Sequence, residues 1–159
     1  MNNFYYRTAN KADASAIAKL FVENVDESYI TASEVIWDRA TPEGRWKPDL
    51  FNTVAQEIEL SADDNSKIIL LFFLDQRLVG YTFSVIKPMG SAEVEDFVVA
   101  ADCRGLGLGK AINEITAEHL RQAGCTNLFM EVGQNNERMK RFVAKDGMQE
   151  TSTRYWKRI

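Results

Sequence analysis

A glycine-rich loop is the segment of this chain whose residue types point most directly to chemistry. Gly105, Gly107 and Gly109 occupy alternate positions after Arg104. An apolar run that ends at Val99 precedes this segment, and an amphipathic stretch begins within it at Gly107. Glycine tolerates positive φ and lets another group approach the backbone closely. Such a loop can direct successive N–H groups toward an anion, beside the positive end of the following helix and a fixed arginine cation. The spacing predicts a phosphate site, and a pyrophosphate fits it best.

Two common nucleotide-binding loops do not fit this spacing. A P-loop needs Gly-x-x-x-x-Gly-Lys-Ser/Thr, but Arg104 holds the first glycine position and Ala111 follows Lys110. A dinucleotide fingerprint needs Gly-x-Gly-x-x-Gly at the opening of an N-terminal βαβ unit. Here Gly-x-Gly-x-Gly falls past the midpoint of the chain. The spacing therefore excludes both a P-loop and a dinucleotide-binding fingerprint.

Three carboxylates in the predicted strand before the loop are candidates for a general base. They are Glu93, Glu95 and Asp96. Alternation along a strand sends Glu93 and Glu95 to one face and Asp96 to the other, unless a bulge shifts the register. Burial at the centre of a sheet raises the pKa of a carboxyl toward the range in which it can accept a proton at neutral pH. A solvated or paired carboxylate with no catalytic role is the alternative.

Hydrophobic periodicity predicts the elements that position these groups. Strands are expected at 4–8, 67–74, 78–86, 93–99, 127–132 and 148–157, and helices after Asn10 and at 50–60, 107–123 and 136–145. Asn10 and Asp13 form an approximate capping box for the first helix. A hairpin followed by strand–helix–strand–helix–strand predicts an α/β or α+β sheet with helices on both faces. The length predicts one domain over residues 1–159.

The loop resembles the Arg/Gln-x-x-Gly-x-Gly/Ala signature of the GNAT superfamily of acyl-CoA-dependent N-acetyltransferases, with Arg104, Gly107 and Gly109 in its three fixed positions. That family usually shows an Asn, a Leu-Tyr pair and a Gly-Phe pair further on. The corresponding positions here are Asn136, Phe142, Gly147 and Met148. The resemblance implies a mixed, mostly antiparallel twisted sheet of about six to seven strands. It also implies acetyl-CoA as cosubstrate and direct transfer of the acetyl group to an amine of a small molecule or peptide.

The resemblance also implies roles for individual residues. Phe97, Val98 and Val99 would lie along the pantetheine arm, with the N–H of Val98 or Val99 polarising the thioester carbonyl. Asn136 would contact the pantetheine or pyrophosphate region, and Phe142 would lie near the cofactor. The loop residues implied to surround the phosphates are Arg104, Gly105, Leu106, Gly107, Leu108, Gly109 and Lys110.

The same comparison assigns the base and reveals one departure from the family pattern. Glu95 resembles the family's base, and Asp96 is the substitute if a bulge shifts the register. Val143 stands where the family often has a tyrosine that protonates the CoA thiolate. Solvent can supply that proton, and Tyr81, Tyr29 and Tyr155 are alternative donors. The departure keeps open a second function, a non-catalytic acyl-CoA-binding sensor.

Bulk composition narrows the class of protein further. A formal net charge of -4 and a pI near 5.1 argue against general nucleic-acid binding, which needs a basic face. Two cysteines and one histidine make a disulfide framework or a metal site unexpected. No signal peptide or membrane span is evident, so a cytoplasmic protein is expected. A homodimer stays open, because dimers are common among the proteins it resembles.

Overall fold

The computed structural model describes residues 3–157, and they divide into two compact units. The first unit contains the chain up to Asn24 together with Phe51–Glu131. The second contains Val25–Leu50 and the chain from Val132 onward. The predicted single domain over residues 1–159 stays a prediction.

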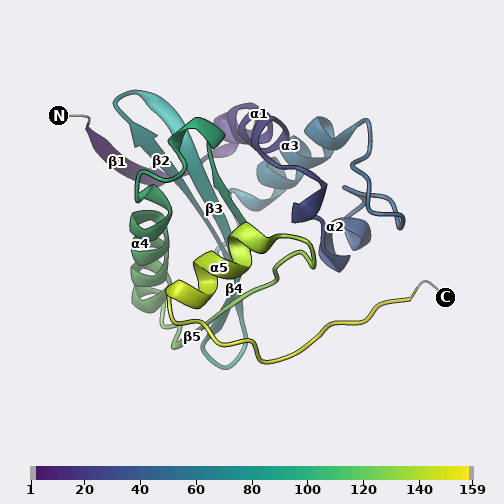
Figure 1. Cartoon of the computed structure of the whole chain (residues 1–159). Coiled ribbons are helices and arrows are strands. Elements are labelled where there is room, and N and C mark those ends of the chain that lie inside the picture. The colour runs from purple at the N-terminus through teal and green to yellow at the C-terminus, as the bar shows by residue number, and fades with distance from the viewer. Residues whose placement is uncertain (1–2, 158–159) are drawn as a thin grey trace. The chain divides into compact units, whose positions relative to one another are not determined.

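A mixed sheet of five strands in the order β1-β2-β3-β4-β5 forms the first unit (Figure 1). β1, β2 and β3 each pair antiparallel with the next strand, and β4 pairs parallel with β5. The strands are β1 (Phe4–Thr8), β2 (Lys67–Leu74), β3 (Arg77–Lys87), β4 (Ser91–Val99) and β5 (Asn127–Met130). The predicted strands of this unit are thus confirmed to within a few residues. β2 reads as a continuous apolar run because residues on both of its faces are buried.

Helices lie on both sides of this sheet (Figure 1). They are α1 (Ala14–Asn24), α3 (Leu50–Ser61) and α4 (Leu108–Gln122). On the α4 side, Ile112 packs against Leu70 and Phe72, all three with 0% exposure. The Oγ1 atoms of Thr82 and Thr116 lie 3.1 Å apart on the same side. α1 packs against β3 and β4 with its buried apolar residues.

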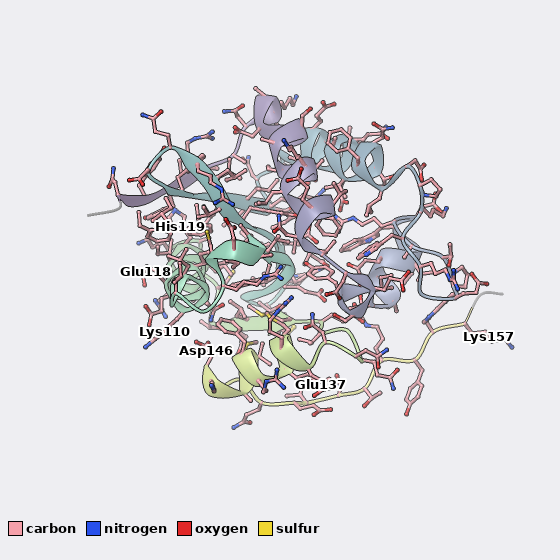
Figure 2. The ribbon with its side chains drawn as sticks, turned by 45° about the horizontal axis from the view of Figure 1, so that its top comes forward. Lys110, Glu118, His119, Glu137, Asp146 and Lys157 are labelled. Carbon is pink, nitrogen blue, oxygen red and sulfur yellow. The ribbon has the colours of Figure 1, made fainter. Side chains whose placement is uncertain are left out.

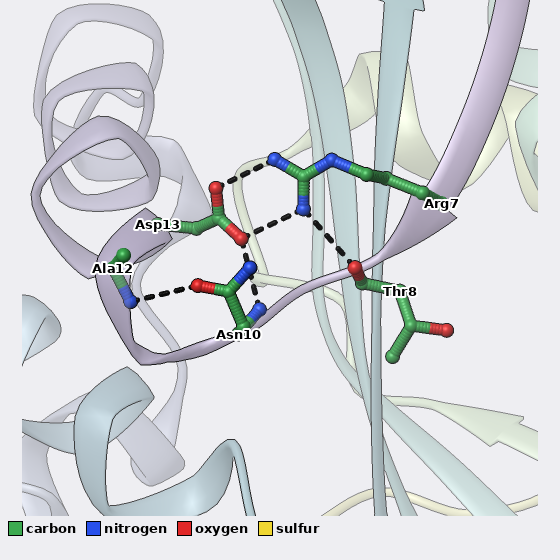
Figure 3. A network of polar contacts seen from close by, with 5 residues as sticks. All are labelled: Arg7, Thr8, Asn10, Ala12 and Asp13. Carbon is green, nitrogen blue, oxygen red and sulfur yellow. Dashed lines mark hydrogen bonds and ion pairs between the residues drawn. The ribbon is translucent and has the colours of Figure 1, made fainter.

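The junction between β1 and α1 is fixed by a polar network (Figure 3). The side chain of Asn10 accepts a hydrogen bond from the N–H of Ala12, and Asp13 accepts one from the N–H of Asn10. Arg7 donates to both carboxylate oxygens of Asp13 at 2.7 Å, which lowers the pKa of that carboxyl. The predicted capping box is confirmed, and such caps stabilise a helix start by about 1 kcal/mol.

The second unit contains α2 (Ala32–Ile36) and α5 (Glu137–Lys145), one in each of its two chain segments. Its buried centre holds Arg39 at 0% and Glu34 at 2% exposure, and Glu34 also closes a capping box with Thr31. Gly133 lies directly against the chain near Ser28, because a Cβ built on Gly133 would be 2.1 Å from the Ser28 carbonyl oxygen. Only glycine fits that approach.

The sequence prediction of the last strand is wrong. Residues 148–157 form no strand in the described structure, and the sheet has five strands there instead of six to seven. β-propensity alone does not make a strand, since the backbone groups need a paired neighbour. Arg154 in this segment instead donates to the Ser33 hydroxyl of α2 at 3.2 Å.

None of the helices within residues 3–157 combines the length and the apolar character needed to cross a membrane.

The core under α4 predicts a large difference between two phenylalanines. Phe72→Ala removes a side chain with 0% exposure, whereas Phe51→Ala removes one with 39% exposure. We expect Phe72→Ala to lower the free energy of unfolding by about 3–5 kcal/mol, through lost burial and the cavity left behind. Phe51→Ala is the matched control, and its effect should be much smaller. Urea unfolding of both variants measures the difference, and equal losses would contradict this account of the core.

Candidate active site

The glycine-rich loop connects the end of β4 to the start of α4. A short 3-10 helix at Ala101–Cys103 precedes it. Gly105 and Gly107 have φ of 82° and 81°, and Gly107 is the residue that precedes the first turn of α4. Among the described residues no side chain caps this helix start. The first N–H groups of α4 and the positive end of its dipole therefore face an exposed loop, which is a suitable place for an anion.

Arg104 has a structural task within this loop. Its Nε donates to the Val99 carbonyl at 3.0 Å, and its Nη2 donates to the backbone carbonyl of Asn24 at the end of α1. The Asn24 side chain in turn accepts a hydrogen bond of 2.7 Å from the N–H of Ala101. These bonds hold both ends of the loop against the sheet and α1.

The other side chains of the loop differ in their exposure to solvent. Lys110 extends from the first turn of α4 (Figure 2) and lies 3.7 Å from Glu114. Leu106 is 67% exposed, and Leu108 packs on the core below α4. Gly109 is already inside the helix. The exposed part of the loop is thus mostly backbone, with a lysine beside it.

β4 has an unpaired edge close to this loop. Its pairing with β5 ends at Val94 opposite Met130, so within residues 3–157 no strand pairs with that edge beyond this point. The N–H of Ala100 donates to Val79 of β3. Since backbone groups alternate sides along a strand, the N–H of Val99 points away from β3, toward the open edge.

The neighbouring side chains of β4 face opposite sides of the sheet. Phe97 packs on the α4 side, with Leu70 and Phe72, and Val98 is 2% exposed. Val98 pairs with Tyr81 of β3, and its side chain lies on the face away from α4.

A register shift between β3 and β4 decides where the carboxylates lie. Phe83 pairs with Asp96, but the next residue, Ser84, pairs with Val94, so Glu95 is an extra residue in β4. Such a bulge moves the residues before it to the other face. The predicted placement of Glu93 and Asp96 on opposite faces is therefore wrong. Both lie on the face away from α4.

Glu95 is held beside two charged neighbours. Lys87 Nζ lies 3.4 Å from a Glu95 oxygen and 3.3 Å from a Glu93 oxygen. The Glu95 side chain is only 6% exposed, against 18% for Glu93 and 40% for Lys87. Burial and, next, the charge of Glu93 raise the pKa of Glu95 to about 7, although Lys87 acts in the opposite direction. A carboxyl of this kind is half ionised near neutrality, as proton transfer at that pH requires.

Asp96 is placed differently from Glu95. It is 0% exposed and accepts a hydrogen bond of 2.8 Å from the hydroxyl of Tyr81, also 0% exposed. Tyr81, one of the alternative proton donors, thus directs its proton to Asp96 inside the core. Of the other two tyrosines, Tyr29 lies beside Trp46 and Tyr155 is 89% exposed, both in the second unit.

Asn136 and Phe142 belong to the second unit. The Asn136 side chain caps α5 by accepting from the N–H of Met139 at 3.0 Å, and it is 6% exposed. Phe142 and Val143 are half-buried on the same helix. Met148 donates its N–H to Val143 around Gly147, whose φ is 84°. The predicted contacts of Asn136 and Phe142 with acetyl-CoA stay predictions.

A cavity of about 490 Å³ lies beside the loop, between α1 and the start of β3. Its wall includes Arg77 and Asp102, joined by two bonds of 2.6 and 2.7 Å. Cys103, next in the chain, is buried, and burial and the charge of Asp102 raise the pKa of its thiol. A thiolate nucleophile is disfavoured there.

Sequence reasoning missed two residues of this region. The contact of Lys87 with acidic residues of β4 was not predicted, because Lys87 follows the apolar part of β3 and precedes Pro88, where the strand was expected to end. The hairpin register, with Lys87 opposite Ser91, was the signal that could have placed it near the acidic strand. Asn24 gave no such signal, since its partners at Ala101 and Arg104 are distant in sequence.

Comparison with known proteins assigns the family. The sequence profile of the acetyltransferase (GNAT) family matches residues 32–148, most of the chain. The protein belongs to this family and is an acetyl-CoA-dependent N-acetyltransferase by class. A search of proteins with curated descriptions found no match.

Solved structures share the fold at low identity. The PaiA N-acetyltransferase from Thermoplasma acidophilum, solved with coenzyme A, has a TM-score of 0.73 at 15% identity, over 96% of this chain and 93% of that one. An aminoglycoside N-acetyltransferase solved with CoA has a TM-score of 0.70 at 14% identity, over 100% and 96%. The ribosomal-protein-alanine N-acetyltransferase from Brucella melitensis has a TM-score of 0.68 at 18% identity, over 99% and 100%. At such identities the similarity shows a shared fold and does not identify the amine that accepts the acetyl group.

The raised pKa of Glu95 predicts a pH-dependent effect of Glu95→Gln on stability. Between the ordinary pKa of 4.5 and the folded value of about 7, the folded protein keeps a proton that the unfolded chain has lost. Stability contributed by that proton is present at low pH and is lost as the pH rises through 7. Wild type loses this contribution as the pH rises, whereas glutamine does not titrate. The free energy of unfolding of Glu95→Gln minus that of wild type should therefore increase by about 2–3 kcal/mol from pH 5 to pH 8.

Urea unfolding at several pH values measures this difference. Glu59→Gln, at an exposed position of α3, serves as the control for the general effect of removing a carboxyl. A Glu95→Gln difference that stays constant with pH, or falls, would show that the pKa of Glu95 is not raised.

Proposed function

We propose that this protein transfers the acetyl group of acetyl-CoA to an amine of a small molecule or peptide, with Glu95 as the base. The observation that carries the proposal is a buried carboxylate with a pKa of about 7, on the same strand whose unpaired edge leads to an uncapped helix start. Together they give an acid–base group, an oxyanion donor and an anion site on one continuous stretch of chain.

The phosphates of acetyl-CoA are proposed to bind at the loop from Arg104 to Lys110. The N–H groups at the start of α4 would donate to the pyrophosphate, and Lys110 would add charge at its outer side. Arg104 would act chiefly by holding the loop, since its guanidinium is bonded to Val99 and Asn24. Gly105 and Gly107 leave open space above the backbone, because a Cβ at either position has no atom within 4 Å in the described structure.

The pantetheine arm is proposed to run along the open edge of β4 near Phe97, Val98 and Val99. The N–H of Val99 points to that edge and would donate to the thioester carbonyl as negative charge develops on its oxygen. The amine nitrogen attacks the carbonyl carbon, and the carbon–sulfur bond then breaks. The amine proton passes to Glu95, directly or through a water molecule, and CoA leaves as a thiolate that takes a proton from solvent.

The buried position of Asp96 favours Glu95 over Asp96 as the base. Asp96 has no exposed surface and already accepts a hydrogen bond from the Tyr81 hydroxyl. Asp96 would instead influence Glu95 through its charge, which raises the pKa of Glu95.

The loop geometry predicts that Gly107→Ala weakens acetyl-CoA binding. A methyl group at this position would stand between the helix start and the phosphates. We expect a loss of about tenfold or more in affinity, measured by isothermal titration calorimetry. Gly124→Ala is the matched control, because Gly124 also has a positive φ and open space but lies just after α4. Equal weakening in the two variants, or no binding by the wild type, would reject the loop as the phosphate site.

The role of Glu95 predicts a loss of turnover in Glu95→Gln. Release of CoA thiol with a panel of primary amines and peptide N-termini measures the rate. We expect kcat to fall by about 10²–10⁴ in Glu95→Gln, with acetyl-CoA affinity unchanged and with Glu59→Gln close to wild type. Wild-type turnover in Glu95→Gln would overturn the base assignment. Tight binding of acetyl-CoA without CoA release for any amine would instead support the sensor alternative that Val143 keeps open.

A further inference from the structure

Lys87 is a cation that contacts acidic residues of β4. It is the last residue of β3 and reaches two carboxylates of β4 at once, Glu93 at 3.3 Å and Glu95 at 3.4 Å. The register shift places Glu93 on the face that carries Asp96, the face to which the odd-numbered residues of β3, Lys87 included, also point.

The charges around Glu95 are unbalanced without Lys87. Glu93 and Asp96 lie on the same strand, and both make an additional negative charge on Glu95 less favourable. α1 packs against β3 and β4 with buried apolar residues, while its charged residues Lys19 and Glu23 are exposed and lie 3.8 Å apart. The cation that acts on Glu95 in the described structure is Lys87.

We propose that Lys87 is a positioning residue for proton removal, holding the Glu95 carboxylate in place and stabilising its ionised form. This inference rests on the proposed role of Glu95 as base. An exposed lysine–carboxylate pair contributes little interaction free energy, because water screens both charges. Here the carboxylate is 6% exposed while the ammonium is 40% exposed, so the lysine stays hydrated while its charge acts in a poorly hydrated region.

The pairing of Lys87 with Glu95 opposes the effects that raise the pKa of Glu95. Burial and Glu93 favour the protonated acid, which cannot accept a proton. Lys87 favours the carboxylate, and the balance leaves the group near its midpoint at neutral pH, with a pKa of about 7. Among the residues that the structure describes, Lys87 is the neighbour that favours the ionised form of Glu95, so its loss favours the protonated acid.

The test compares Lys87→Met, which removes the charge and keeps the length, with Lys87→Arg, which keeps the charge. Two readouts are used. One is the pH dependence of kcat/KM with one fixed amine, because the ionisation of the amine then cancels between variants. The other is a ¹³C NMR titration of the glutamate carboxyls in the free protein, with Glu95→Gln identifying the Glu95 resonance. Lys11→Met is the control, since Lys11 is exposed and pairs with Asp63, which is not among the carboxylates of β4.

In Lys87→Met we expect both midpoints to rise by about one pH unit, since an opposite charge at this distance lowers a carboxyl pKa by about 1–3 units. A rise from 7 to 8 lowers the ionised fraction at pH 7 from one half to one eleventh, an activity loss of about fivefold. That loss should disappear by pH 9. Lys87→Arg and Lys11→Met should keep the wild-type midpoints.

Unchanged midpoints in Lys87→Met would overturn the proposal. So would a loss of activity that persists at high pH, or an equal shift in Lys87→Arg, because either result indicates a structural role. Failure of the wild type to acetylate any amine would reject the proposed function, whereas the NMR titration would still decide whether Lys87 controls the ionisation of Glu95.

Discussion

Between Phe83 and Ser84, β3 and β4 change register by one residue, and the arrangement of the acidic face follows from that shift. The extra residue is Glu95, so the carboxylates before and after it point to the same face. A strand of regular alternation would have buried one of them under α4. The bulge therefore concentrates negative charge at one place in the sheet, where solvent reaches little of it.

Concentrated negative charge in a sheet needs local compensation, and two different kinds are present. Asp96 is satisfied by a hydroxyl inside the core, from Tyr81. Glu95 and Glu93 share the ammonium of Lys87, which remains partly in water. The neutral donor fixes Asp96 in a single buried arrangement. The hydrated cation leaves Glu95 able to gain and lose a proton, with a pKa of about 7, and this difference suits Glu95, and not Asp96, to the proposed proton transfer.

The same strand connects this face to the glycine-rich loop. Beyond Val94, β4 runs without β5 beside it in the described structure, and the strand then passes into the loop that opens α4. Arg104 and Asn24 tie the two ends of that loop to the sheet and to α1. The open strand edge and the ionisable carboxylate thus lie on β4, and the bonds of the loop tie the uncapped start of α4 to the end of the same strand.

The sequence alone determined the elements of the first unit and the position of the loop, because periodicity and glycine spacing are local properties. It also singled out Glu95 as the proposed base, through a family resemblance carried by local motifs. Tertiary structure decided the rest. Whether residues 148–157 pair as a strand depends on a neighbouring edge, and the face on which Glu93 lies depends on a pairing register between strands. The partner of Glu95 is likewise a residue of another strand, Lys87, and only the folded register brings their charges within a few ångströms of each other.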